Sequence, residues 1–127
     1  MSPRDAELLA AARARLRGVR RTLEDDVDEP DLAVGAAYYA VLLAARAALS
    51  SRDLYAKTRS GTWSLFSREL VRDGSVDAAL AKEAAAMQHA REQVDYEAVS
   101  ATRLEAERMV AVAERFVGAI EALLTDG

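Results

Sequence analysis

The feature that most constrains this chain is a long uncharged stretch near its middle. Residues 32–45 carry no charged side chain, and Arg46 is the only charged residue between Leu32 and Leu49. The uncharged run is well short of the ~20 residues needed to cross a bilayer. A helix that is apolar on nearly every side has to be packed on several sides. The stretch therefore predicts the buried central helix of a helical bundle.

Composition supports an all-α domain and excludes several classes. A length of 127 residues predicts one domain over 1–127. Aromatic residues make up 6% of a chain that is 51% hydrophobic, so Ala, Leu and Val must fill the core. Only 6 Gly and 2 Pro leave few turns, which argues against a many-stranded β fold. At 30% charged residues, a membrane protein is not expected. The absence of cysteine excludes disulfides and thiolate metal sites, and no signal peptide is visible, so we expect a cytoplasmic location.

Hydrophobic spacing and capping residues predict an antiparallel bundle of four to five helices. Thr102 or Ser100 is expected to cap the last helix, where Thr102 and Glu105 form a capping box. The predicted helices run from Ser2 to about Leu23, from Asp31 to about Leu49, from Thr62 to about Arg72, from Ser75 to about Tyr96, and from Thr102 to about Leu124.

Basic residues and the single histidine give ambiguous signals. Four arginines are predicted on one side of the first helix, where they either track a phosphate backbone or form a solvated face balanced by the acids at 24–29. The net charge of -4 favours the solvated face. His89 is either a lone acid or base or a boundary residue, and we interpret it as the latter. The four arginines are Arg13, Arg17, Arg20 and Arg21.

Arg91 and Asp95 stand four residues apart on the predicted fourth helix, with Tyr96 next. On spacing alone they form an intrahelical ion pair, worth only about 0.3–0.5 kcal/mol when exposed. The alternative is that the two residues face a functional groove, and the rest of the sequence gives this alternative weight.

Four blocks in order resemble the HEPN domain family. The segment 35–49, with its paired tyrosines, resembles the signature second helix of that family. Residues 57–61, followed by Phe66, resemble the next block. Residues 91–96 resemble an Arg…Asp-Tyr motif at the end of the fourth helix, and residues 113–116 resemble a segment of the closing helix. Each block alone is weak, but together they extend over nearly the whole chain.

The resemblance implies a helical bundle that pairs into a homodimer. Many relatives are toxins encoded beside a minimal nucleotidyltransferase that neutralises them. In active members, an Arg followed by four to six residues and then a His forms a metal-independent ribonuclease site, doubled across the dimer. RNA carries its own nucleophile, the 2′-OH, so cleavage needs a group to take that proton and a cation for the charge that grows on phosphate. No metal or other cofactor is expected.

This chain departs from the catalytic pattern. Arg91 matches the family's Arg, but Tyr96, Glu97 and Ala98 occupy the positions where His would fall. Asp95 stands one residue before that window, and an aspartate with a pKa of ~3.9 is a weak base at neutral pH.

Two further residues take roles from their motif positions. Arg59, where relatives often carry His, is a candidate to add positive charge to a shared groove. Tyr96 is a candidate for modification by the partner, or else a packing residue.

Two hypotheses follow. In the first, the protein is a HEPN ribonuclease that uses Arg91 with an altered base, Asp95. In the second, it is a non-catalytic dimeric helical module that binds the nucleotidyltransferase partner or RNA. We favour the partner-linked, toxin-like HEPN protein with a degenerate ribonuclease motif, in which Arg91 of each chain faces a common cleft in a homodimer.

Overall fold

The computed structural model describes residues 1–96 and 100–126, without the side chains of 93–95 and 126. Over these residues the protein is all-helical, as predicted, with no strand. Five α-helices are joined by short connections, and two of them are extended by a turn of other helical geometry. The elements are α1 (Pro3–Leu16), a 3₁₀ segment η1 (Val19–Leu23), α2 (Pro30–Ser50), α3 (Arg59–Phe66), a π-helical segment η2 (Ser67–Val71), α4 (Ala78–Tyr96) and α5 (Arg103–Asp126).

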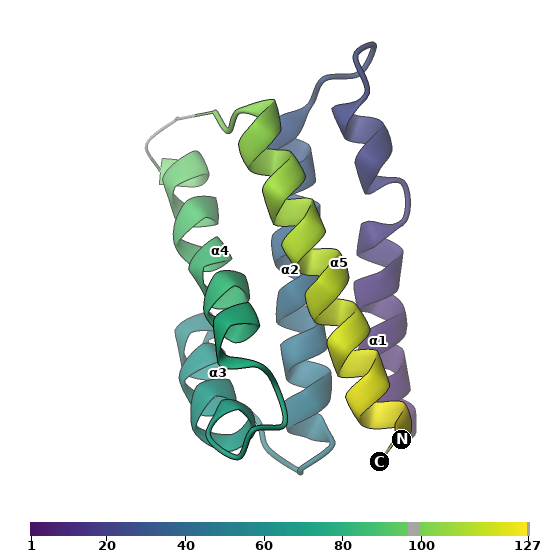
Figure 1. Ribbon diagram of the computed structural model, residues 1–127, viewed down its shortest axis with the longest axis vertical. Helices are drawn as coiled ribbons and strands as arrows, with labels where there is room; N and C mark the ends of the chain where they lie inside the picture. The colour runs from purple at the N-terminus through teal and green to yellow at the C-terminus, as the bar shows by residue number, and fades with distance from the viewer. Residues whose placement is uncertain (97–99, 127) are drawn as a thin grey trace.

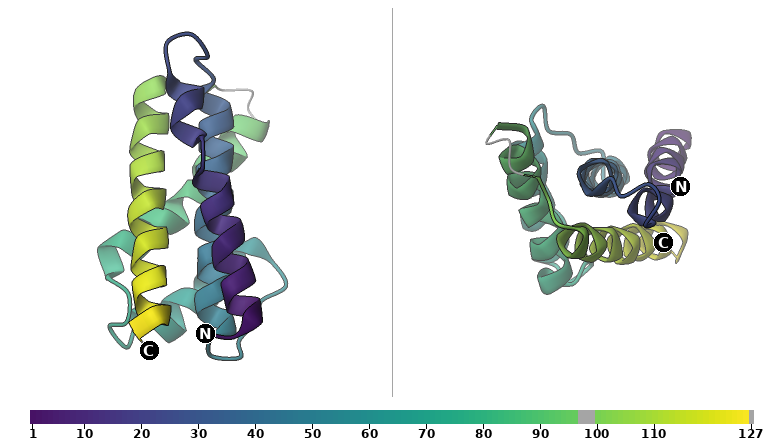
Figure 2. Two further views of the ribbon diagram at one scale, coloured as in Figure 1. Left: turned by 90° about the vertical axis from the view of Figure 1, so that its right-hand side faces the viewer. Right: turned by 90° about the horizontal axis from the view of Figure 1, so that it is seen from above.

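The helices run up and down around α2. Helices α1 and α4 run in one direction, whereas α2 and α5 run in the other, and both chain ends lie at the same end of the bundle (Figure 1). Helix α2 contacts every other α-helix. Seen from above, α1 and α4 flank α2, and α5 crosses one side of it (Figure 2). The apolar segment is thus the centre of the bundle, as its composition predicts.

Burial of α2 depends on small side chains. This helix is long and apolar enough to cross a membrane by length and composition, but 72% of its most apolar stretch is buried within the protein. Alanines supply much of the buried face, which lets the neighbouring helices approach closely. The larger side chains gather where α3 meets α5. There Trp63, Phe66 and Phe116 form a cluster with ring centroids 5.5 to 5.8 Å apart.

The first helix begins as predicted but ends early. The Ser2 hydroxyl accepts a hydrogen bond from the Asp5 N–H, and the Asp5 carboxylate accepts one from the Ser2 N–H. The predicted continuation to Leu23 is wrong, because Gly18 takes a left-handed conformation with φ of 74°. Glycine adopts this conformation without a steric penalty. The chain therefore turns at Gly18 and resumes as η1 in a new orientation.

Three predicted helix starts also differ from the structure. Asp31 does not cap α2, which begins at Pro30; its carboxylate instead accepts a hydrogen bond from the Ala101 N–H at 2.7 Å. Thr58, not Thr62, caps α3 by accepting from the Gly61 N–H at 2.9 Å. Helix α4 begins at Ala78, three residues after Ser75. At α3 and α4 a nearby residue of similar capping ability takes the position: Thr58 at α3, and at α4 Asp77, whose carboxylate accepts from the Leu80 N–H at 3.0 Å. Glu29, before α2, makes no side-chain cap hydrogen bond.

The last helix begins as predicted. The Thr102 hydroxyl accepts from the Glu105 N–H, and the Glu105 carboxylate accepts from the Thr102 N–H, each at 3.1 Å.

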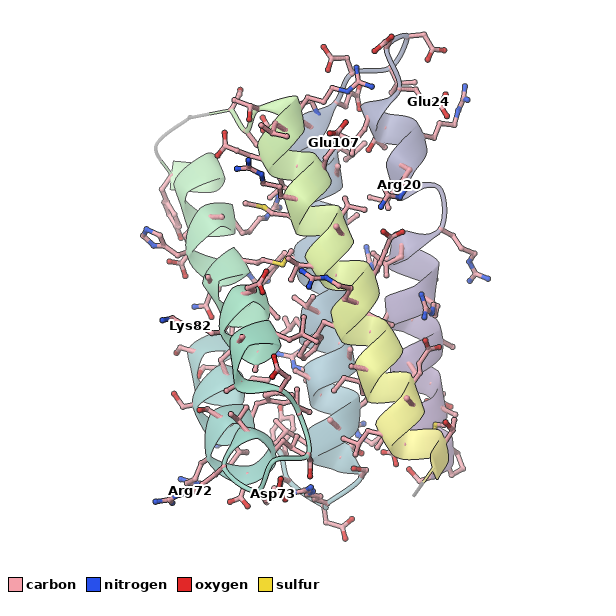
Figure 3. All side chains as sticks on the ribbon, viewed as in Figure 1. Arg20, Glu24, Arg72, Asp73, Lys82 and Glu107 are labelled. Carbon is pink, nitrogen blue, oxygen red and sulfur yellow. The ribbon has the colours of Figure 1, made fainter. Side chains whose placement is uncertain are left out.

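An acid at the corner before α4 should make stability depend on pH. Hydrogen bonds from the hydroxyl and backbone N–H of Ser75, and then from Arg52, lower the pKa of Asp73 from 3.8 to about 2. Asp73 lies at the foot of the bundle (Figure 3). Because this pKa is depressed in the folded state, its contribution to stability is complete above pH 3.8. It is lost as the pH falls toward 2.

We expect Asp73→Asn to flatten this pH dependence. Urea midpoints for the wild type should fall between pH 3.8 and about 2 more steeply than those of Asp73→Asn. Asp26→Asn is the control, because Asp26 is exposed in the loop before α2 and has no ion pair among the described residues. Identical slopes for wild type and Asp73→Asn would contradict the assignment.

Candidate functional site

Arg91 of α4 rests directly on the backbone of α2. A Cβ atom added at Gly35 would lie 2.8 Å from Nη1 and 3.4 Å from Cζ of Arg91. Any side chain at position 35 would therefore displace the guanidinium. Glycine within a helix is unfavourable by about 0.5–1 kcal/mol relative to alanine. Gly35 thus has a packing reason to be there, which is to accommodate the half-buried side chain of Arg91.

The Arg91 guanidinium lines a groove of about 510 Å³ between α1, α2 and α4. Arg15 and Arg17, at the end of α1, lie on the opposite wall. Asp31 is the only acid among the described residues that line it, and its Oδ1 accepts the hydrogen bond from Ala101. The groove is therefore basic although the whole chain is acidic. Its lining consists of Arg15, Arg17, Gly18, Val19, Thr22, Asp31, Leu32, Gly35, Ala36, Tyr39 and Arg91.

The floor of the groove is a stripe of α2 that the other helices leave partly exposed. Leu32, Ala36, Tyr39 and Leu43 recur at steps of four, three and four residues, so they share one face of the helix. Leu32 is 57% exposed, and the other three are half-buried. No residue of α5 lines the groove, because α5 covers another side of α2 (Figure 2).

Tyr39, one helical turn beyond Gly35, is held by two arginines from different helices. The Cζ of Arg15 lies 5.4 Å from the ring centroid, and that of Arg59 lies 5.3 Å from it. Arg59 also donates a hydrogen bond to the Tyr39 hydroxyl at 2.9 Å.

The neighbouring Tyr38 is fully buried, and its hydroxyl makes no hydrogen bond with the described residues. Burial raises the pKa of the Tyr38 phenol, and the charge of Arg59 opposes this rise. Of the paired tyrosines, Tyr39 therefore lines the groove, whereas Tyr38 is part of the core.

The structure brings two of the four predicted site residues to the same face of α2. Arg91 lies on Gly35, and Arg59 lies on Tyr39. Tyr96, at the end of α4, is 87% exposed, so it is not part of the core of this chain. The side chain of Asp95 lies outside the described residues. His89 is exposed and does not line the groove, which agrees with its interpretation as a boundary residue.

The predicted grouping of four arginines on one face of the first helix is wrong. Arg13 pairs with Glu121, and Arg20 pairs with Glu114, both on α5. Arg21 pairs with Glu24 at 3.1 Å. Arg17 alone of the four lines the groove. The turn at Gly18 ends the regular periodicity on which the prediction rests, so that Arg13 and Arg20, on either side of it, both face α5 while Arg17 does not.

Sequence reasoning missed Gly35, Arg15 and Tyr39 as site residues. A glycine within an otherwise apolar helix was an available signal, since such a residue often marks a close contact. Arg15 had no comparable signal in the sequence, because Tyr39, the residue that it contacts, belongs to another helix.

The described residues contain no group of three His, Asp or Glu side chains placed to hold a metal ion. The cations that converge on the groove are suited to phosphate, because guanidinium groups bind phosphate oxygens in a bidentate manner.

Comparison with known proteins adds the family. The model of the HEPN domain matches residues 6–123. The chain belongs to the HEPN domain family. No curated protein matches it. The HEPN match spans α2, α3 and α4 and most of α1 and α5, and it includes every described residue that lines the groove.

Gly35→Ala should displace Arg91 without unfolding this HEPN domain. Alanine favours the helix by up to about 1 kcal/mol, and the atom in its way is the mobile end of a side chain. The urea midpoint should therefore stay at or above that of the wild type, while the NMR resonance of the Arg91 Nε–Hε group shifts.

Gly118→Ala in α5 is the matched control, because its nearest neighbour, Nη2 of Arg13, lies 4.0 Å away. This variant should leave the Arg91 resonance unchanged. An unchanged resonance in Gly35→Ala as well would show that the guanidinium does not rest on Gly35.

Proposed function

We propose that this HEPN protein acts on RNA and that Arg91 binds a backbone phosphate in the groove. The observation that carries the proposal is the position of the Arg91 guanidinium, against Gly35 and across from Arg15 and Arg17. A half-buried cation in a groove of like charge favours an anion more strongly than a cation on an open surface, because water screens it less.

RNA cleavage is the second candidate, and it needs a base besides the cation. In such a step a base removes the proton of the 2′-OH, the 2′ oxygen attacks phosphorus, and the 5′ oxygen leaves with a proton. Arg91 would stabilise the charge that develops on the phosphate oxygens. No histidine lines the groove among the described residues. Asp95, four residues after Arg91, is the proposed base, so we place binding before cleavage.

We also propose that the protein is the toxin-like member of a two-gene module with a minimal nucleotidyltransferase, and that it works in the cytoplasm as a homodimer. The exposure of Tyr96, 87%, supports the proposal that a partner enzyme modifies it. A group added there would lie on α4, the helix that also carries Arg91. Leu32, the exposed end of the α2 stripe, supports self-association, since a second copy that packs on it would leave Arg91 of each chain facing a common cleft.

Arg91→Ala should weaken binding of a short single-stranded RNA at least tenfold, because a charge-assisted hydrogen bond contributes about 1.5–3 kcal/mol. Fluorescence anisotropy in EDTA measures the affinity, and gel analysis of the same samples detects cleavage. Arg108→Ala removes the same charge from an exposed position on α5 that does not line the groove, so it should bind like the wild type.

Equal binding by wild type and Arg91→Ala would refute the proposal. If the wild type cuts RNA in EDTA, Arg91→Ala should abolish cutting and Asp95→Asn should slow it. Cutting that survives both substitutions would remove the second candidate.

The homodimer has its own test. Sedimentation equilibrium at micromolar concentration should give the mass of two chains. Leu32→Glu should weaken the dimer at least tenfold, because it removes about 1.5–3 kcal/mol of apolar burial and adds a charge. Leu104→Glu is the control, since Leu104 is 55% exposed on α5 and lies outside the groove. A wild-type monomer, or equal effects of both substitutions, would contradict a dimer across this face.

A further inference from the structure

Two arginines beside the groove keep their charge unneutralised. Arg15 and Arg59 approach the ring of Tyr39 from α1 and α3, and neither has an acidic partner among the described residues. Among the described residues, the only hydrogen bond that either arginine makes with a side chain is the one from Arg59 to the Tyr39 hydroxyl. Both guanidinium groups lie within 5.4 Å of the centroid of one ring, so an anion beside Tyr39 would be attracted by both charges.

The distribution of ion pairs shows that this charge is concentrated on one face. Arg13 and Arg20 are neutralised by glutamates of α5, and Arg115 of α5 pairs with Glu83 of α4 at 3.3 Å. These pairs lie where α5 packs against its neighbours. On the α2 stripe, by contrast, Arg15 and Arg59 have no ion pair with any of the described residues.

The cations stand at two levels along α2. Arg91 lies at the level of Gly35, and Arg15 and Arg59 lie at the level of Tyr39. Four residues of helix separate the levels by about 6 Å. This spacing is comparable to that of successive phosphates in an extended single strand. Ala36, on the same stripe, offers an apolar surface to a sugar or base.

We propose that Arg15, Tyr39 and Arg59 form a second phosphate site, so that a single strand of RNA lies along α2 with neighbouring phosphates at the two levels. This inference rests on the proposed function, because it takes Arg91 as the first phosphate site. Tyr39 holds the two guanidinium groups in place through its ring and its hydroxyl. A nucleic acid strand carries one negative charge per nucleotide, so it can place neighbouring phosphates at both levels. An isolated anion can occupy only one of them.

The salt dependence of RNA binding tests the second site. For single strands, the slope of log K against log salt falls by about 0.7 for each phosphate that the protein no longer neutralises. The double variant Arg15→Ala/Arg59→Ala should therefore reduce the slope by up to about 1.4 and bind a short single-stranded RNA at least tenfold more weakly. Arg72→Ala/Arg108→Ala removes two exposed arginines elsewhere and should keep both slope and affinity.

A conservative variant separates charge from folding. Arg15→Lys/Arg59→Lys keeps two cations and should keep the slope, although it gives up bidentate hydrogen bonds and some affinity. Thermal unfolding of every variant shows that each one is folded. If Arg15→Ala/Arg59→Ala is unfolded, a reduced slope in Tyr39→Ala supports the second site and an unchanged slope refutes it.

Outcomes distinguish the two proposals. If Arg91→Ala weakens binding while Arg15→Ala/Arg59→Ala leaves the slope unchanged, the second site is wrong and the proposed function stands. If neither substitution affects RNA binding, both are wrong. If the double variant keeps RNA binding but no longer forms the dimer, these arginines bind an acidic protein surface, and the inference is overturned.

Discussion

The enclosure of α2 is the constraint on which the rest of the structure depends. This helix is apolar on nearly every side, so each of its faces has to be removed from water by another element. Helices α1, α3, α4 and α5 all pack against it. They nevertheless leave the stripe that begins at Leu32 partly exposed, and this stripe becomes the floor of the groove. The site is thus a consequence of incomplete coverage of the core helix, and it needs no separate element.

Charge is sorted around that stripe by how the helices pack. Where α5 meets its neighbours, arginines and glutamates from facing helices neutralise each other. No described residue of α5 lines the groove, so the glutamates of α5 that neutralise Arg13 and Arg20 do not neutralise Arg15. A chain with a net charge of -4 can therefore present a basic groove. Net charge describes the average surface, whereas binding depends on the local arrangement.

The sequence predicted well those features that depend on local pattern. The central helix, the helix count, the capping box at Thr102 and the cap at Ser2 all follow from spacing and residue type. The contacts between helices were beyond its reach. Nothing in the periodicity showed that Asp31 would bond to Ala101, or that Arg15 would reach Tyr39.

The regular helical pattern was itself misleading at Gly18. It extended the first helix through a residue that breaks it, and so it grouped arginines that the fold separates. The side chain of the candidate base, Asp95, lies outside the described residues, so its role stays a prediction from the sequence.

The corner at Gly18 has a consequence for how such a chain tolerates changes in length. Surface corners usually accept inserted or deleted residues. Here the left-handed residue, Gly18, sets the rotation of η1 relative to α1. Arg17, just before it, lines the groove, and Arg20, just after it, pairs with a glutamate of α5. One residue more or less would turn everything beyond it by about 100°. Homologous chains should accordingly vary in the acidic segment before α2, and keep the distance from Arg15 to Arg20 fixed.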